Sequence, residues 1–162
     1  MSSGAYNADR SAKSRASFPL PDVEWEIASP YWQGAAAGEL RLPFCARCGV
    51  VSWYPKPLCR SCGAHEFEWR SVRGAGTLFS FSVVRHPFLP QYSDLLPFAP
   101  ALVELEDVPG VRIVTRIVDS RLEELRCDAR VEVVFHPLRF AGVKGEVMAP
   151  LFRLASAEQI DV

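Results

Sequence analysis

The 162-residue sequence has no excess of charge of either sign, because 18 Lys and Arg residues face 19 Asp and Glu residues and the formal net charge is -1. Proteins that bind a phosphate backbone usually carry a clear basic excess, so this balance argues against nucleic acid as the main partner. No window of about 18 apolar residues occurs, which predicts no transmembrane helix and no membrane partner. Residues 1–17 lack the apolar centre of a secretory signal. We therefore expect a cytoplasmic protein.

Sequence motifs of common enzyme classes are also missing. Neither a GxSxG nor an HExxH pattern is present, and the three histidines are scattered along the chain. Cys127 stands apart from the other cysteines and lies beside Asp128, whose negative charge opposes formation of a reactive thiolate. We therefore expect Cys127 to be a small buried residue, and we expect no catalytic residue in this chain.

The other four cysteines form two CxxC pairs, Cys45 with Cys48 and Cys59 with Cys62, with ten residues between the pairs. Each pair is followed directly by glycine, which allows the sharp turn that brings both thiolates to one ion. Four thiolates complete a tetrahedral shell and leave no open position, so the pattern predicts a structural Zn²⁺ site. Iron in a rubredoxin-like site stays open as an alternative metal, and His65 as an alternative ligand.

The rest of the chain predicts one short helix and several strands. Ser29 as a cap and Pro30 at the first helical position predict a helix start, and Gly38 predicts its end. Alternating apolar residues predict five strands, which suit a small closed or partly open barrel. These strands are expected at residues 76–85, 101–106, 111–118, 130–135 and 145–154.

A long apolar loop separates the first two expected strands. Residues 86–100 hold four prolines, two phenylalanines, a tyrosine and three leucines. A connection of this length and composition is rarely a plain link. Either the loop folds back on the barrel, or it presents an apolar face to a ligand or partner.

The order of these parts resembles one known family closely. The stretches CARCG and CRSCG flank Tyr54-Pro55, and the sequence RGAGTLFSF follows at residues 73–81. Together they resemble the family with a rubredoxin-like zinc ribbon and an OB-fold, catalogued as domain of unknown function thirty-five and called acyl-CoA-associated. The resemblance covers about residues 29–154. One departure is Arg126-Cys127-Asp128, where the family tends to have a glycine before the fourth barrel strand.

This resemblance implies a mainly β protein with a short N-terminal helical segment, in which a zinc ribbon is followed by a five-stranded OB-fold barrel. It implies a non-catalytic, acyl-CoA-binding accessory subunit that completes the active site of a thiolase-superfamily thiolase or aldolase, with steroid side-chain or aromatic acyl-CoA degradation favoured and a heterotetramer expected. From composition and the resemblance together we expect a flexible tail and extended arm (1–28), a helix (29–39), the ribbon (40–72), the OB-fold (73–155) and a C-terminal tail (156–162).

Coenzyme A offers phosphates to arginines and an apolar chain to a groove. The candidate residues for binding the ligand or the partner are Arg41, Arg60, Arg73, Arg85, Phe88, Leu89, Tyr92 and Phe98. The alternative is a module that binds single-stranded nucleic acid through aromatic residues such as Phe79, Phe81 and Trp69. Because Phe79 and Phe81 share one face of a strand, we expect both to point into the barrel instead.

Overall fold

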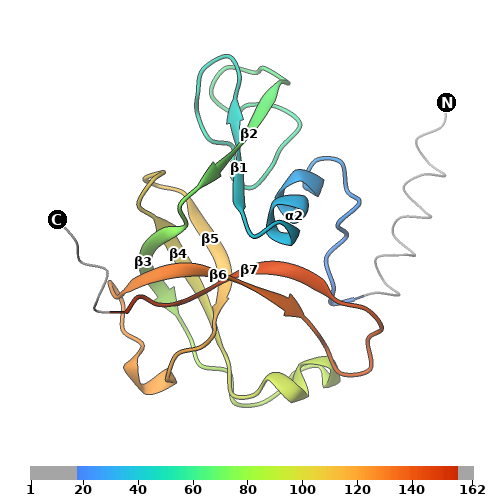
Figure 1. Cartoon of the computed structure of the whole chain (residues 1–162), viewed down its shortest axis with the longest axis vertical. Helices are drawn as coiled ribbons and strands as arrows, with labels where there is room; N and C mark the ends of the chain where they lie inside the picture. Colours follow the sequence, from blue (N-terminus) through green and yellow to red (C-terminus); the bar gives the residue numbers. More distant parts are fainter. Residues whose placement is uncertain (1–17, 157–162) are drawn as a thin grey trace.

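The computed structural model describes residues 18–156, so residues 1–17 of the expected tail and arm (1–28) and residues 157–162 of the expected C-terminal tail (156–162) lie outside the described part. Figure 1 shows a two-stranded ribbon above a barrel, with α2 beside β1 and above β7. No helix within residues 18–156 is long and apolar enough to span a membrane. The elements are α2 (Ser29–Ala36), β1 (Leu40–Cys45), β2 (Phe67–Val72), β3 (Ala75–Phe81), the 3-10 helix η1 (Pro90–Leu95), β4 (Ala99–Leu105), β5 (Arg112–Ile117), the 3-10 helix η2 (Leu122–Glu124), β6 (Arg130–Leu138) and β7 (Val147–Leu154).

Five strands close into a barrel in the order β3-β4-β5-β7-β6. All neighbouring strands are antiparallel except β5 and β7, which run parallel and meet at Ile117 and Phe152. The ribbon is a separate antiparallel pair, in which β1 runs beside β2 from Leu40 opposite Val72 to Cys45 opposite Phe67. This architecture confirms the expected ribbon followed by a five-stranded barrel.

The ribbon and the barrel share one hydrophobic core. Leu40 and Leu42 of β1 are buried in the same cluster as Leu78, Val103 and Phe152 of the barrel. Because each of these side chains is at most 2% exposed, the lower half of the ribbon is packed as tightly as the barrel interior. Burial of apolar side chains therefore stabilises the base of the ribbon, and only the tip needs another source of stability.

Strand β4 follows the expected alternation, but β3 breaks it. Phe79 directly follows the inward-facing Leu78 and so points outward, and the pairing of β3 with β4 then shifts between Leu78 and Ser80. This bulge brings Phe81 back to the core side of the strand, opposite the buried Ala101. The side chain of Phe79 is 43% exposed, and the guanidinium of Arg112 lies 3.5 Å from the ring centroid. The expectation that Phe79 points into the barrel is wrong, whereas Phe81 packs partly buried against the core.

The helix begins without the expected side-chain cap. The cap position is Ala28 rather than Ser29, which already belongs to the first turn, and no side chain caps the helix. Gly38 follows the cap residue Ala37 at the end of α2 with a φ of 74°, as expected for a glycine that ends a helix.

The turn before β6 contains a second correction. Cys127 is exposed, not buried. The next residue, Asp128, has a φ of 66°, which is the left-handed conformation that glycine adopts most easily and that aspartate tolerates better than most residues. Asp128 therefore supplies the backbone conformation for which the related proteins tend to use a glycine, and the turn carries Cys127 on its outer side.

Candidate functional site

Each CxxC pair forms a tight turn that a glycine closes. The N–H of Gly49 donates to the carbonyl oxygen of Cys45 at 2.8 Å, and the N–H of Gly63 donates to that of Cys59 at 2.9 Å. The two glycines have φ values of 72° and 73°. These two nearly identical turns face each other at the tip of the ribbon, so that all four thiols point to one place.

The distances between the sulfur atoms fit one tetrahedral ion. Sγ of Cys45 lies 3.6 Å from Sγ of Cys62, Sγ of Cys48 lies 3.6 Å from Sγ of Cys59, and all four sulfur atoms lie within 4.8 Å of one another. Zinc–sulfur bonds of about 2.3 Å in a tetrahedron place sulfur atoms about 3.8 Å apart. Four cysteine donors therefore match the size of a metal centre that has no open position.

A backbone hydrogen bond favours the charged form of one of these thiols, that of Cys45. The N–H of Cys48 hydrogen-bonds to Cys45 and lowers the pKa of its thiol to about 7, because the hydrogen bond stabilises the thiolate. His65 is not part of the group of close ligand atoms within residues 18–156, which consists of the four cysteines. The centre thus offers four sulfur ligands and needs no histidine.

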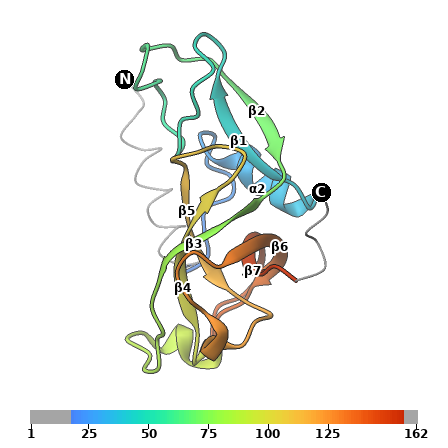
Figure 2. The ribbon, with the colours of Figure 1, turned by 90° about the vertical axis from the view of Figure 1, so that its left-hand side faces the viewer.

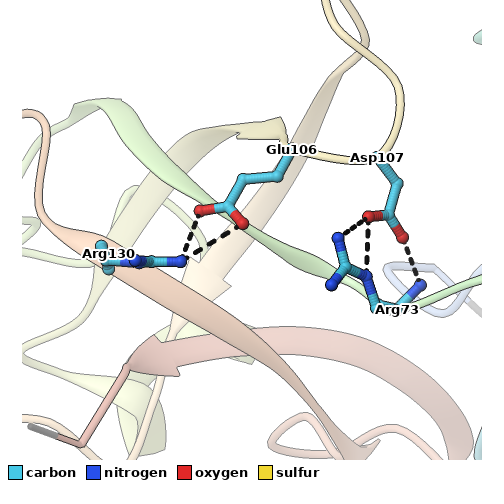
Figure 3. Close-up of polar contacts among 4 residues, drawn as sticks. All are labelled: Arg73, Glu106, Asp107 and Arg130. Atoms are coloured by element: carbon cyan, nitrogen blue, oxygen red, sulfur yellow. Dashed lines mark hydrogen bonds and ion pairs between the residues drawn. The ribbon is translucent and has the colours of Figure 1, made fainter. Parts of the chain in front are cut away.

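Arg73, a candidate ligand-binding residue, is engaged in a contact at the junction of ribbon and barrel (Figure 3). Its Nη2 lies 2.6 Å from Oδ1 of Asp107, and its backbone N–H donates to Oδ2 at 2.8 Å. Hydrogen bonds from Arg73 hold the pKa of the Asp107 carboxyl below its usual range. Beside this contact, Arg130 pairs with Glu106 at 3.0 Å. These two ion pairs tie the start of β3 and of β6 to the turn after β4.

The other candidate arginines lie on separate segments. Arg41 of β1 pairs with Glu39 at 2.8 Å. Arg60 lies in the second cysteine turn and Arg85 follows β3, and neither forms an ion pair within the described part of the chain. The guanidinium groups of Arg60 and Arg85 are therefore the two among the four candidates that are not already paired with a carboxylate.

The long loop between β3 and β4 brings its apolar candidates together. Phe88, Leu89, Tyr92 and Phe98 line a groove of about 210 Å³. Tyr92 stacks on Phe98 with ring centroids 6.0 Å apart and meets the edge of Phe140 at 5.3 Å, so part of the loop folds back on the barrel. Phe88 is 95% exposed and Leu89 is 41% exposed, so the loop also presents an apolar face. The first alternative from the sequence thus holds for Tyr92 and Phe98, whereas Phe88 and Leu89 stay candidates for the second, contact with a ligand or partner.

Two features of the surface escaped the sequence analysis. One is a groove of about 520 Å³ between the segment before α2, the helix itself and the start of β7, where Val23, Trp32 and Met148 lie together. The other is a contact between ribbon and barrel, in which the N–H of Val114 donates to the hydroxyl of Tyr54 at 3.0 Å. Both join residues far apart in the chain. The sequence analysis named Tyr54-Pro55 as part of a motif, but this motif does not indicate which residue Tyr54 contacts.

Comparisons with known proteins agree with this geometry. Residues 32–68 match the family described as the ChsH2 rubredoxin-like zinc ribbon domain, and residues 69–136 match the ChsH2 C-terminal OB-fold domain. A DUF35 domain-containing scaffold protein of Methanothermobacter thermautotrophicus is 31% identical over 104 residues, which are 64% of this chain and 76% of the relative. The match between this relative and our chain thus spans most of the relative.

Two further relatives carry names that refer to coenzyme A. A probable enoyl-CoA hydratase alpha subunit of Thermomonospora curvata is 30% identical over 150 residues, which are 91% of this chain but 43% of the relative, so the chain spans less than half of its length. The benzoylsuccinyl-CoA thiolase subunit BbsA of Geobacter metallireducens is 26% identical over 95 residues, 59% of this chain and 60% of the relative. Among solved structures, the Ltp2-ChsH2(DUF35) aldolase contains a chain with a TM-score of 0.71 and 26% identity, over 85% of this chain and 100% of that chain.

Proposed function

Since the chain belongs to the DUF35 family of proteins with a zinc ribbon and an OB-fold, we propose that it is a non-catalytic accessory subunit that completes the active site of a thiolase-superfamily thiolase or aldolase. The observation that carries this proposal is the fold shared with a whole chain of the Ltp2-ChsH2(DUF35) aldolase. The name of BbsA, a subunit of a thiolase, points to the same class of partner.

The metal centre has a structural role in this proposal. The four cysteine sulfurs would hold Zn²⁺, and a shell of four thiolates leaves no position for water or substrate. A bound ion would fix the two cysteine turns relative to each other and so shape the tip of the ribbon. The metal itself then takes no direct part in the reaction.

The ligand in this proposal is an acyl-CoA held between the chain and its partner. The apolar groove at Phe88 and Leu89 suits an acyl or pantetheine chain. Arg85 begins the same loop, and its guanidinium, which forms no ion pair within residues 18–156, suits a phosphate. Steroid side-chain or aromatic acyl thioesters are the favoured substrates, because such groups are large and apolar. A dimeric partner would make the assembly a heterotetramer. The paired cysteines at metal-ligand spacing suit a cytoplasmic protein.

A tagged pull-down from the native host, followed by mass spectrometry, tests the proposal. We expect a thiolase-superfamily protein in comparable amount. That protein, purified alone, should cleave acyl-CoA thioesters poorly and should gain activity when the purified chain is added. Size-exclusion chromatography with light scattering then gives the stoichiometry.

Two results would overturn the proposal. One is recovery of RNA, or of no thiolase-superfamily protein, which would indicate a free-standing binding module. The other is thiolysis or aldol cleavage by the purified chain alone that Cys127→Ser abolishes, because this result would place the catalyst in the chain itself.

A further inference from the structure

The segment between the two metal-binding turns contains no acidic residue. Residues 46–64 carry three basic side chains, Arg47, Lys56 and Arg60, and none of them forms an ion pair within residues 18–156. The same segment exposes large apolar side chains, since Tyr54 is 46% and Leu58 is 45% exposed. Basic and apolar groups side by side, without acids, are typical of a surface that meets an acidic partner.

This segment continues onto the outer face of the barrel. The hydroxyl of Tyr54 accepts the N–H of Val114 in β5, and the side chain of Val114 is 63% exposed. Figure 2 shows the ribbon loop reaching down to the end of β5 on one side of the molecule, with β3 and β4 and the long loop below it. Tyr54 thus links the ribbon loop to β5 of the barrel.

The pairing of β4 with β5 connects this surface to the apolar loop between β3 and β4. Val114 lies opposite Leu102 and Arg116 lies opposite Pro100, and side chains of opposed residues share one face of a sheet. Pro100 also lines the groove formed by Phe88 and Leu89. A continuous strip therefore runs from the ribbon, over the outer side chains of β4 and β5, to the loop. We call this strip the β4–β5 face: Tyr54, Pro100, Leu102, Val114 and Arg116.

Arg116 lies in the middle of this face, and one nitrogen of its guanidinium is buried without a hydrogen-bond partner. Its Nε is buried and has no hydrogen-bond partner, and Arg116 makes no ion pair with any residue in the described range 18–156. Burial lowers the pKa of its guanidinium, since water is removed from the charge and no carboxylate replaces it. A half-buried cation without a partner is costly in the free protein and is stabilised when a carboxylate docks against it.

We propose that the β4–β5 face is the surface to which the thiolase-like subunit docks, with a carboxylate of that subunit paired to Arg116. The proposal rests on the function proposed above and adds which surface the partner covers. Valine, leucine and proline give the centre of the face a dry apolar character that suits a protein interface, whereas single-stranded nucleic acid needs a row of exposed rings. The one acid on the outer side of β4, Glu104, is already paired with Arg112 at 2.7 Å.

The test uses the full chain and the purified thiolase-superfamily protein identified by the pull-down, with the dissociation constant measured by calorimetry. Arg116→Glu should raise the dissociation constant at least about 30-fold, because it replaces a buried attraction with repulsion. Val114→Asp should weaken binding without harming the fold, since Val114 is exposed. Arg126→Glu is the matched control, because Arg126 is also unpaired within the described chain but lies in the turn before β6.

A zero-length carbodiimide cross-link between Lys56 and a carboxylate of the partner gives a second readout that needs no variant on the face. The inference is overturned if the wild-type chain binds the partner and both face variants bind equally well, and the proposed function then stands. If the wild-type chain binds no thiolase-superfamily protein, both the function and this inference are wrong. Loss of bound RNA rather than of the partner in Arg116→Glu would also overturn it.

Discussion

Gly74 shows, at the scale of a single residue, how closely the ribbon is joined to the barrel. Its φ is 73°, and a Cβ at this position would fall onto Cγ1 of Val133, only 2.8 Å from the Cβ of that valine. The same conformation occurs at Gly142, where a Cβ would meet nothing within 4 Å. Gly74 is thus required both for its backbone conformation and for the close approach of β6.

The pair of glycines separates these two requirements in one experiment. Gly142→Ala should cost about 1 kcal/mol, which is the price of the left-handed conformation alone. Gly74→Ala should cost about 2–4 kcal/mol, because overpacking against Val133 adds to that strain. Urea unfolding followed by circular dichroism measures both values. Equal costs at the two positions would show that the contact with Val133 relaxes freely.

A second prediction at this scale concerns the carboxylate of Asp107. Its pKa in the folded protein lies below the usual value because it accepts hydrogen bonds from Arg73. The resulting stability is present above the ordinary aspartate pKa of about 4 and is lost as the pH falls through the lowered folded value. Asp107→Asn should therefore lose about 1 kcal/mol at pH 7, since the exposed guanidinium limits the gain.

Thermal melts of the wild type and of Asp107→Asn at pH 7, 5 and 3 check this prediction. The difference in melting temperature should stay constant from pH 7 to 5 and shrink towards pH 3. Glu106→Gln removes the neighbouring pair with Arg130 and serves as the control for a general effect of lost charge (Figure 3). A difference that grows on acidification would contradict the assigned contact.

At the scale of elements, local patterns predicted what depends on neighbours in sequence. The two CxxC turns need only a few residues each, and the alternation of apolar residues located all five barrel strands within a few positions. The bulge at Phe79 was missed because it depends on how β3 is paired with β4, which the sequence of β3 alone does not contain. The exposure of Cys127 was missed for a similar reason, since Asp128 takes the left-handed conformation only within this turn.

The proposed binding surfaces could be predicted less completely than the metal centre. Phe88 and Leu89 were singled out from the sequence because the loop is long and apolar by itself. Tyr54, Val114 and Arg116 were not found, because they come together only through the packing of the ribbon on β5 and through strand register. The four candidate arginines were grouped because they lie close together in the sequence. In the structure, Arg73 is instead paired with Asp107.

The long loop allows a prediction that separates binding from folding. Replacing both Phe88 and Leu89 by Ser should change the free energy of unfolding by less than about 0.5 kcal/mol, because Phe88 is almost fully exposed. The same variant should weaken binding of the partner or of acyl-CoA about tenfold or more, since exposed aromatic anchors dominate interfaces. Calorimetric titration and thermal melting measure the two effects.

Phe98→Ser is the contrasting variant in the same loop. Phe98 is partly buried and stacks on Tyr92, so loss of its ring should lower stability by about 2 kcal/mol or more. If the double variant at Phe88 and Leu89 were instead the less stable one, the loop would be part of the core and not a binding surface.

At the scale of the whole molecule, the shared core decides how the protein responds to loss of its metal. The ribbon strand β1 contributes Leu40 and Leu42 to the cluster that includes Leu78 and Phe152 of the barrel. Because these side chains belong to one core, the base of the ribbon cannot unfold without removing part of the core of the barrel. We therefore expect the ribbon and barrel to unfold in a single cooperative transition, with and without metal.

Cys48→Ser tests this coupling, because a shell of three thiolates cannot replace the closed one. The variant should lose its bound metal and melt in one transition at least about 10 °C lower, which corresponds to roughly 3 kcal/mol for a chain of this size. Elemental analysis and scanning calorimetry give both readouts, and chelation of the wild type should reproduce the shift. Cys127→Ser is the control, since Cys127 is exposed and outside the group of close sulfur atoms. A barrel transition that stays at the wild-type temperature after metal loss would show that the two parts fold independently, and the ribbon would then be a separable attachment to the barrel.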